Sequence, residues 1–313
     1  MNKNNGKQTK SGVPFGVWAS IKKGTGLLVI EVINSNPNGN PDNAGAPRVR
    51  DDGTGEISPQ SVKRKLRDLV DLKEGPVWQS IAQDLGLDVE RFHILESRGR
   101  TSEQIVAEVK RNAFVSRYWD SRTFGRALLE ASDKTMGLTA DQKATIISAG
   151  PVVFGLGLSV APVEVRELTL TGKAAVQKDK NGSMAPGAFK VVEHGLYTIP
   201  FYINPSLAPS SGCTQQDIEM FLRLLPYVYS HTSSAVRPTV NLIHAWYAEH
   251  QPTKTGFHLG SCPDHLIIGA LTPSRKGNDP TRPSSKLSDY EVPDALPDEL
   301  KARLASFRDI CLQ

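Results

Sequence analysis

The chain has 313 residues, enough for one large domain or two, and 39% of them are hydrophobic, so it can bury a substantial core. Its formal net charge is only +4, so a strongly basic surface would require segregation of its charges. No segment approaches the roughly 18 consecutive apolar residues that span a bilayer. Its three widely spaced cysteines predict neither a disulfide framework nor a Cys-x-x-Cys metal site, which is typical of a cytoplasmic protein. Residues 1–14 lack the apolar segment of a signal peptide and are predicted to form a disordered basic tail.

Residues 26–33 predict a buried strand that ends at a polar loop. The run is apolar and rich in β-branched residues, and it is too short for a capped helix. The loop that follows is built from Asn, Pro, Gly and Asp. Its Asn38-Gly39 pair favours positive φ, while its prolines fix φ. Such a loop is costly to keep for packing alone, so we expect a functional site there.

A helix is predicted directly after this loop. Ser58 can cap it, and Pro59 suits its first position. Its apolar residues recur at the spacing of one buried face: Val62, Leu66, Leu69 and Val70. Four cations are left off that face, with only Asp68 opposing them: Lys63, Arg64, Lys65 and Arg67. They suit a polyanion that passes both the loop and the helix, although a basic run of this kind can also be a solvated face.

The stretch from about 72 to 115 is helical and polar, and we interpret it as an insertion in which one helix ends at Gly86. Residues 117–126 then interleave arginines with aromatic residues, a mixture that pairs with phosphates and stacks on bases. We therefore predict that Arg122 and Phe124 contact RNA. The alternative is that the aromatic residues belong to the core and that a carboxylate such as Asp120 holds Arg122. A brief helix capped by Thr139 follows.

Two strand-like runs, at 151–160 and 163–171, precede a long excursion that covers about residues 172–194. The excursion contains Lys173 and Lys190, an Asn181-Gly182 turn and the adaptable Met184. Excursions of this length are uncommon in a compact domain unless they have a function. The alternative is a basic loop without a function.

The C-terminal third continues with a strand at 195–204 and a helix for which Thr214 and Asp217 form a capping pair. Residues 239–250 and 264–273 predict two more strands, and residues 276–313 a tail that ends in a short amphipathic helix. The coarse order is strand, helix, two strands, helix, strand. It predicts an α+β protein with a β-α-β-β-α-β, ferredoxin-like core over residues 15–275, the class of the RNA recognition motif (RRM).

Four strings occur in a recognisable order: NSNPNGNPDNAGAPRV with SVKRKLRDLV, then YWDSRTFG, GPVVFGLGLSVAPV and MAPGAFKVVEHGLY. Together they resemble the repeated backbone subunit (the Cas-seven type) of type I CRISPR Cascade surveillance complexes, with the I-C/I-B branch closest. One departure is Asn40, where the family usually carries an acid. The resemblance implies an RRM-like palm with a helical finger and a projecting hairpin, the thumb, at 172–194.

The resemblance also implies the function. We expect a non-catalytic protein without a cofactor or metal that polymerises head to tail along CRISPR RNA (crRNA), binds its phosphate backbone and presents the spacer for pairing with target DNA. The implied partners are crRNA, the complementary DNA strand, further copies of the chain, and end-capping and large Cascade subunits. The residues predicted to bind RNA are Asn34, Asn36, Asn38, Gly39, Arg48, Lys63, Arg64, Arg67, Arg122, Phe124, Lys173, Met184 and Lys190.

The alternative function is a metal-dependent ribonuclease that uses Asp42, similar to the backbone subunits of type III complexes. One carboxylate among asparagines is a thin metal site, so we expect Asp42 to hold the loop through an Asx turn instead. His258, Cys262 and His265 lack a fourth ligand in a recognisable zinc frame. The sequence contains neither a phosphate-binding G-x-x-x-x-G-K-[ST] loop nor a nucleophile elbow.

Overall fold

The computed structural model describes residues 21–96, 101–127, 137–172, 185–251, 262–277, 279 and 281–312. The predicted N-terminal tail, Lys173, Met184, the Asn181-Gly182 turn and His258 lie outside these residues.

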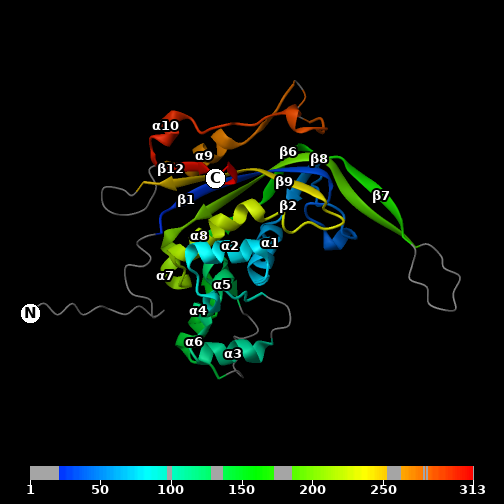
Figure 1. The fold of residues 1–313 in the computed structure, drawn as a ribbon. Coiled ribbons are helices and arrows are strands. Elements are labelled where there is room, and N and C mark those ends of the chain that lie inside the picture. The colour runs from blue at the N-terminus through cyan, green and yellow to red at the C-terminus, as the bar shows by residue number, and fades with distance from the viewer. Residues whose placement is uncertain are drawn as a thin grey trace, which may run out of the picture.

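An antiparallel sheet forms the centre of the molecule (Figure 1). Its main path runs in the order β12-β9-β1-β8-β6-β2, and β5 and β7 each pair with β8. The strands are β1 (Gly24–Ser35), β2 (Thr54–Ile57), β5 (Val152–Phe154), β6 (Gly157–Pro162), β7 (Val165–Gly172), β8 (Ala185–Ile203), β9 (Thr239–His250) and β12 (Leu304–Asp309). The prediction of a mixed α+β protein is confirmed.

Strand β1 lies between β8 and β9 and is buried on both faces, which explains its apolar run Leu27, Leu28, Val29 and Ile30. Leu28 and Ile30 belong to the larger hydrophobic core, whereas Leu27 and Val29 belong to a second core on the opposite face. Close packing also requires Gly26, because a Cβ atom there would lie 2.0 Å from the ring of Phe201.

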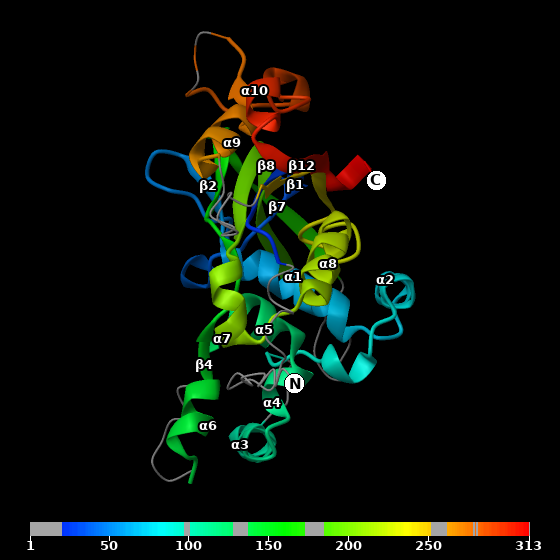
Figure 2. The same ribbon diagram turned by 90° about the vertical axis from the view of Figure 1, so that its left-hand side faces the viewer.

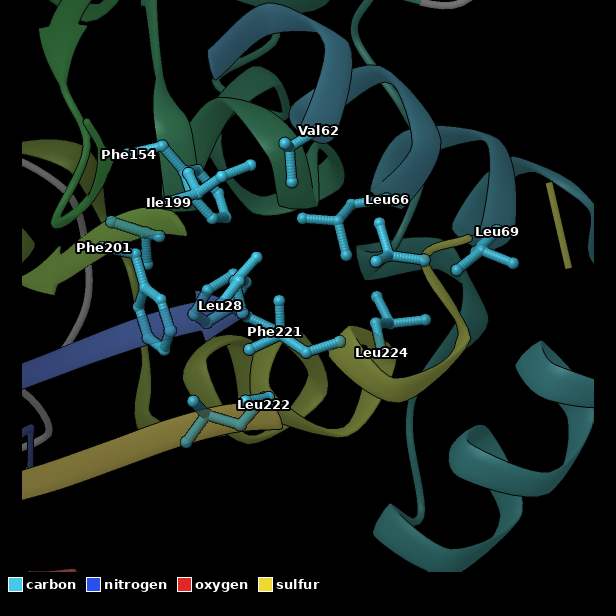
Figure 3. Packing of buried hydrophobic residues seen from close by; sticks show 14 of the residues in the cluster. Leu28, Val62, Leu66, Leu69, Phe154, Ile199, Phe201, Phe221, Leu222 and Leu224 are labelled. Carbon is cyan, nitrogen blue, oxygen red and sulfur yellow. The ribbon is translucent and has the colours of Figure 1, made fainter. Parts of the chain in front are cut away.

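Helices α1 (Pro59–Asp71), α2 (Pro76–Leu85) and α8 (Gln215–Leu224) cover one face of the sheet. The predicted caps are confirmed. Ser58 Oγ accepts a hydrogen bond from the Ser61 amide at 3.3 Å, and Thr214 and Asp217 form a capping box. Figure 3 shows the apolar residues of α1 and α8 pointing toward one another over Leu28 of β1. The predicted stop of α2 is also confirmed, since Gly86 is left-handed at φ 58°.

Helix α9 (Asp264–Leu271) and the C-terminal segment cover the other face (Figures 1 and 2). The strand predicted at 264–273 is therefore wrong. The apolar run buries Ile267 and Leu271 at helical spacing, and the Thr25 hydroxyl donates to Asp264 Oδ1 at 2.6 Å in the first turn of α9.

The predicted C-terminal amphipathic helix is also largely wrong. The α-helix α10 covers Asp298–Lys301, Leu304 and Phe307 lie in β12, and Cys311 lies in a short 3-10 helix, Ile310–Leu312. This strand pairs with β9 and extends the sheet, so the tail docks within its own chain.

Further helices lie on the far side of α1 and α2 from the sheet (Figure 2). They pack around a third, smaller core that includes Phe114, Tyr118 and Ile146. The boundaries predicted for the helical insertion stay a prediction. The remaining elements are α3 (Ser102–Lys110), α4 (Phe114–Arg117), α5 (Trp119–Phe124), α6 (Ala140–Thr145), α7 (Ala208–Ser211), β3 (Gly125–Ala127), β4 (Ile147–Ala149), β10 (Ser274–Arg275) and β11 (Tyr290–Glu291).

Strands β7 and β8 form a two-stranded extension that projects from the body of the protein (Figure 1). Their pairing runs from Val165 opposite Val192 to Gly172 opposite Ala185. The base of the predicted excursion is therefore a paired hairpin. Among the described residues, no helix combines the length and the hydropathy needed to cross a membrane.

Candidate nucleic-acid interface

Residues 36–50, here called the Asn loop, close onto the N-terminus of α1. The Asn38 side-chain oxygen accepts a hydrogen bond from the backbone amide of Ser58, the N-cap residue, at 2.6 Å. The Asn38 carbonyl accepts from the Arg48 amide at 3.1 Å. Asn38 thus joins the two arms of the loop to the helix, and the juxtaposition predicted from the sequence is present.

Within the loop, Gly39 and Pro47 form an isolated β-bridge. Positive φ occurs at Asn34, Ala44 and Gly45, so the expectation for the Asn38-Gly39 pair is wrong. Gly39 is required for a different reason: a Cβ atom there would lie 2.9 Å from the Gly45 carbonyl oxygen.

The turn at the tip of the Asn loop is held by Asn40. Its side-chain oxygen accepts from the Asp42 amide at 3.2 Å and caps a short 3-10 helix, Pro41–Asn43. The Asx role expected of Asp42 therefore belongs to Asn40, and the Asp42 side chain is exposed. No group of three or more His, Cys, Asp or Glu side chains that could hold a metal ion occurs in the described part of the chain.

Asn36 connects the Asn loop to the segment that precedes β9. Its amide donates to the Val236 carbonyl at 2.8 Å, and its side-chain nitrogen donates to the Gly45 carbonyl at 2.7 Å. Asn36 is only 7% exposed, and within the described residues its side-chain oxygen has no hydrogen-bond partner. Asn34, at the end of β1, is exposed in a left-handed conformation with φ 45°.

The four cations of α1 lie in different environments, not on one basic face. Arg67 is 6% exposed, and it donates to Asp120 Oδ2 at 2.9 Å and to Glu96 Oε1 at 2.8 Å. Its role is therefore structural, and the expectation that it contacts a phosphate is corrected. Arg64 is exposed in an ion pair with Asp68 at 2.7 Å. An exposed pair of this kind is worth only about 0–1 kcal/mol, so a phosphate can compete for Arg64.

Arg122 and Phe124 are also part of the interior, as in the alternative interpretation, but Arg122 pairs with the distant Asp217 and not with the local Asp120. Arg122 is 1% exposed and forms a bidentate pair with Asp217, at 3.0 Å through Nε and 2.6 Å through Nη2. Its other donors reach three backbone carbonyls. Phe124 packs edge-on against Trp119 and Phe221. In this conformation neither side chain can contact RNA.

Besides Arg64, three predicted cations remain available, one on α1, one in the Asn loop and one on the hairpin. Lys63 is half-buried, with Nζ 5.5 Å from the centre of the Phe124 ring, and burial followed by the nearby Arg67 lowers its pKa. Arg48 is partly exposed, and its Nε has no hydrogen-bond partner among the residues that the structure describes. Lys190 is exposed on β8, opposite Glu167 of β7.

Two further cations, Lys65 of α1 and Arg237, are not among the residues predicted to bind RNA. Lys65 is 4% exposed and points over the ring of Tyr229, with Nζ 5.1 Å from the ring centre. Burial, and next the positive charge of Arg237, lower its pKa to about 7. The sequence placed Lys65 off the buried face of α1, which is wrong, and nothing local to Arg237 indicated that it would lie near this helix.

The fold and this site define an α+β protein with a closed polar loop beside a helix that carries cations, an arrangement suited to a polyanion. A family model described as CRISPR-associated protein Cas7 matches residues 22–294, and the chain belongs to this family. The family predicted from the sequence is thus confirmed, while the I-C/I-B branch stays a prediction.

Solved structures give weaker likenesses. One, described as "CRISPR RNA-guided surveillance complex, pre-nicking", shares 16% identity at a TM-score of 0.45, over 73% of this chain and 78% of that chain. Another, "CRISPR RNA-guided surveillance complex", shares 18% identity at a TM-score of 0.36, over 76% of each chain. The family assignment therefore depends on the family model. No curated protein matches the chain.

Proposed function

We propose that this protein is a backbone subunit of a CRISPR surveillance complex. Copies of the chain polymerise head to tail along crRNA, bind its phosphate backbone and present the spacer for pairing with a target DNA strand. The observation that carries the proposal is the family match over residues 22–294. End-capping and large subunits complete the assembly.

The sheet topology supports an RRM-like palm. The chain order β1, α1, β6, β8, α8, β9, with the spatial order β9-β1-β8-β6, is that of a β-α-β-β-α-β core. Helices cover both faces of this sheet, however, so bases cannot stack on it as in an ordinary RRM. The RNA must therefore bind elsewhere on the subunit.

The Asn loop and the start of α1 are the part of the subunit best suited to the RNA backbone. Arg48 and Lys63 supply positive charge there, and Arg64 can exchange Asp68 for a phosphate. The bridge between Gly39 and Pro47 and the backbone hydrogen bonds within the loop hold it in one conformation beside α1. The β7–β8 hairpin reaches over the guide, and Lys190 lies near its base.

Ribonuclease protection of co-purified crRNA tests this proposal. Repeated subunits protect regularly spaced steps, whereas a generic single-stranded RNA binder gives one isolated footprint. A triple variant, Arg48→Ala, Lys63→Ala and Arg64→Ala, should weaken RNA binding. The salt slope, which is the decrease of the logarithm of the binding constant with the logarithm of the salt concentration, should fall by about 0.7 for each phosphate that the variant no longer neutralises.

A charge-matched control replaces three exposed cations elsewhere, Arg223, Lys276 and Lys286, with Ala, and it should keep the wild-type slope. Protein that assembles in cells with its transcript yet purifies without RNA as a monomer would overturn the proposal. An unchanged salt slope in the triple variant would show that Arg48, Lys63 and Arg64 do not bind the RNA backbone.

A further inference from the structure

Lys65 and Arg237 both reach residues 229–232, and neither has a carboxylate partner among the residues that the structure describes. Lys65 Nζ lies over the Tyr229 ring and donates to the hydroxyl and carbonyl oxygens of Ser61, at 2.8 and 3.3 Å. Arg237 Nη2 donates to the Thr232 carbonyl at 2.8 Å. In the described ranges, neither side chain has a carboxylate oxygen within 4.0 Å. The acid that acts most on Lys65, Asp68, is already paired with Arg64.

Two other buried cations, Arg67 and Arg122, are neutralised by the fold, whereas Arg126 is held by the Thr145 and Ser211 carbonyls. Arg67 has Asp120, and Arg122 has Asp217. Burying a charge without a partner is unfavourable, and a like charge nearby increases that cost. The lowered pKa of Lys65, caused by burial and then by Arg237, reflects this environment. An anion placed at the pair would remove both effects.

The pair lies where three parts of the candidate interface meet. Lys65 belongs to α1, and Arg237 belongs to residues 230–238, which are tied to the Asn loop by the bond from the Asn36 amide to the Val236 carbonyl. Buried hydrogen-bonding atoms near this junction also lack partners in the part of the chain that is described: Arg237 Nε, Asn36 Oδ1 and the Tyr229 hydroxyl. Arg237 Nε is a donor that suits a phosphate oxygen, and Asn36 Oδ1 is an acceptor that suits a hydroxyl.

We propose that Lys65 and Arg237 together hold one phosphate of the bound RNA at the junction of α1, the Asn loop and residues 230–238. This inference rests on the proposed function and adds a contact that joins the segment before β9 to the RNA. Binding leaves Lys65 protonated, so the free protein takes up a proton from solution when RNA binds above pH 7. RNA affinity therefore falls as the pH rises from 6.5 to 8.5.

The groups that face Lys65 are Arg237, Asp68 and the Tyr229 ring. Burial raises the pKa of Tyr229 above this range. His231 is exposed, packs against the ring of Tyr227 and is present in every variant.

The test measures the affinity of the purified chain for a single-stranded RNA by fluorescence anisotropy at pH 6.5, 7.5 and 8.5, together with the melting temperature. Lys65→Met and Arg237→Gln should each weaken binding about tenfold or more at pH 6.5, the effect of losing one charge-assisted hydrogen bond. The RNA affinity of Lys65→Met should also depend less on pH than that of the wild type. Its melting temperature should be no lower than that of the wild type, since the substitution removes an unpaired buried charge.

Lys73→Met is the matched control. Lys73 follows the same helix, donates to the Phe92 carbonyl at 2.7 Å and lies 3.3 Å over the Trp78 ring, with a pKa lowered to about 8 by burial. This variant should bind RNA within about twofold of the wild type.

If the wild type binds RNA and Lys65→Met and Arg237→Gln bind like Lys73→Met, this inference fails while the proposed function stands. If the wild type binds no RNA, the proposed function fails. Loss of binding together with a lower melting temperature in both variants would assign the pair a structural role and would also overturn the inference.

Discussion

Arg122 provides the sharpest test of how the fold uses its cations. Replacing it with Met leaves Asp217 buried without a counter-ion, because the two side chains are 1% and 0% exposed and paired at 2.6 Å. Removing one partner of a buried ion pair costs about 3–5 kcal/mol. Asp217 keeps bonds from the Thr214 amide and hydroxyl at 2.8 and 2.9 Å, which limits the loss. We expect Arg122→Met to destabilise the protein by about 4 kcal/mol.

Urea denaturation followed by circular dichroism measures this difference, and RNA affinity is determined per folded molecule. The control is Arg64→Met, which breaks an exposed pair with Asp68 and should change stability by no more than about 1 kcal/mol. Arg122→Met should keep the RNA affinity of the wild type under folding conditions. If Arg122→Met were as stable as the wild type but did not bind RNA, the structural role would be refuted and Arg122 would be a phosphate ligand.

Three further outcomes follow from close packing, hydrogen bonding and burial. Asn38→Ala removes the acceptor of the Ser58 amide, so it should lower the free energy of unfolding by about 1–2 kcal/mol and weaken RNA binding. If stability and RNA affinity both stayed at their wild-type values, the link between the Asn loop and α1 would be contradicted. Gly26→Ala places a Cβ atom 2.0 Å from the Phe201 ring and should cost at least about 3 kcal/mol, measured by urea midpoint. The unfolded chain binds the Lys65 proton more tightly than the folded protein does. The free energy of unfolding of the wild type without RNA should therefore rise by about 2 kcal/mol from pH 7 to 9, relative to that of Lys65→Met. If the difference between the two proteins did not change with pH, Lys65 would keep its ordinary pKa.

Elements with strong local signals were predictable from the sequence. Strand β1, helix α1 with its Ser58 cap, and helix α8 with its Thr214 capping box agree with the structure, because each is determined by apolar spacing and a nearby cap. The C-terminal elements were not. Residues 264–271 form a short apolar run that suits a strand or a helix equally, and packing over the sheet decides between them.

The site shows the same division between local and distant information. The contact between the Asn loop and α1 was predictable because the two are neighbours in the chain. The partners of Arg122 and Lys65 were not, since Asp217 and Arg237 come from segments far along the chain. A motif that mixes arginines with aromatic residues is compatible with a core as well as with RNA, and only the distant carboxylate distinguishes the two.

The distribution of charge has a consequence for assembly. Because carboxylates neutralise Arg67 and Arg122 inside the fold, these two cations do not add to the charge that the described part of a subunit offers to RNA. If Arg48, Lys63 and the Lys65–Arg237 pair contact about three phosphates, the salt slope for one subunit is about 2, and a single subunit binds weakly. Tight binding then requires neighbouring copies on one RNA, which raise each other's effective concentration. We therefore expect affinity, measured by anisotropy on RNAs of increasing length, to rise steeply once a second copy fits. An affinity independent of length would show that one subunit holds the RNA alone.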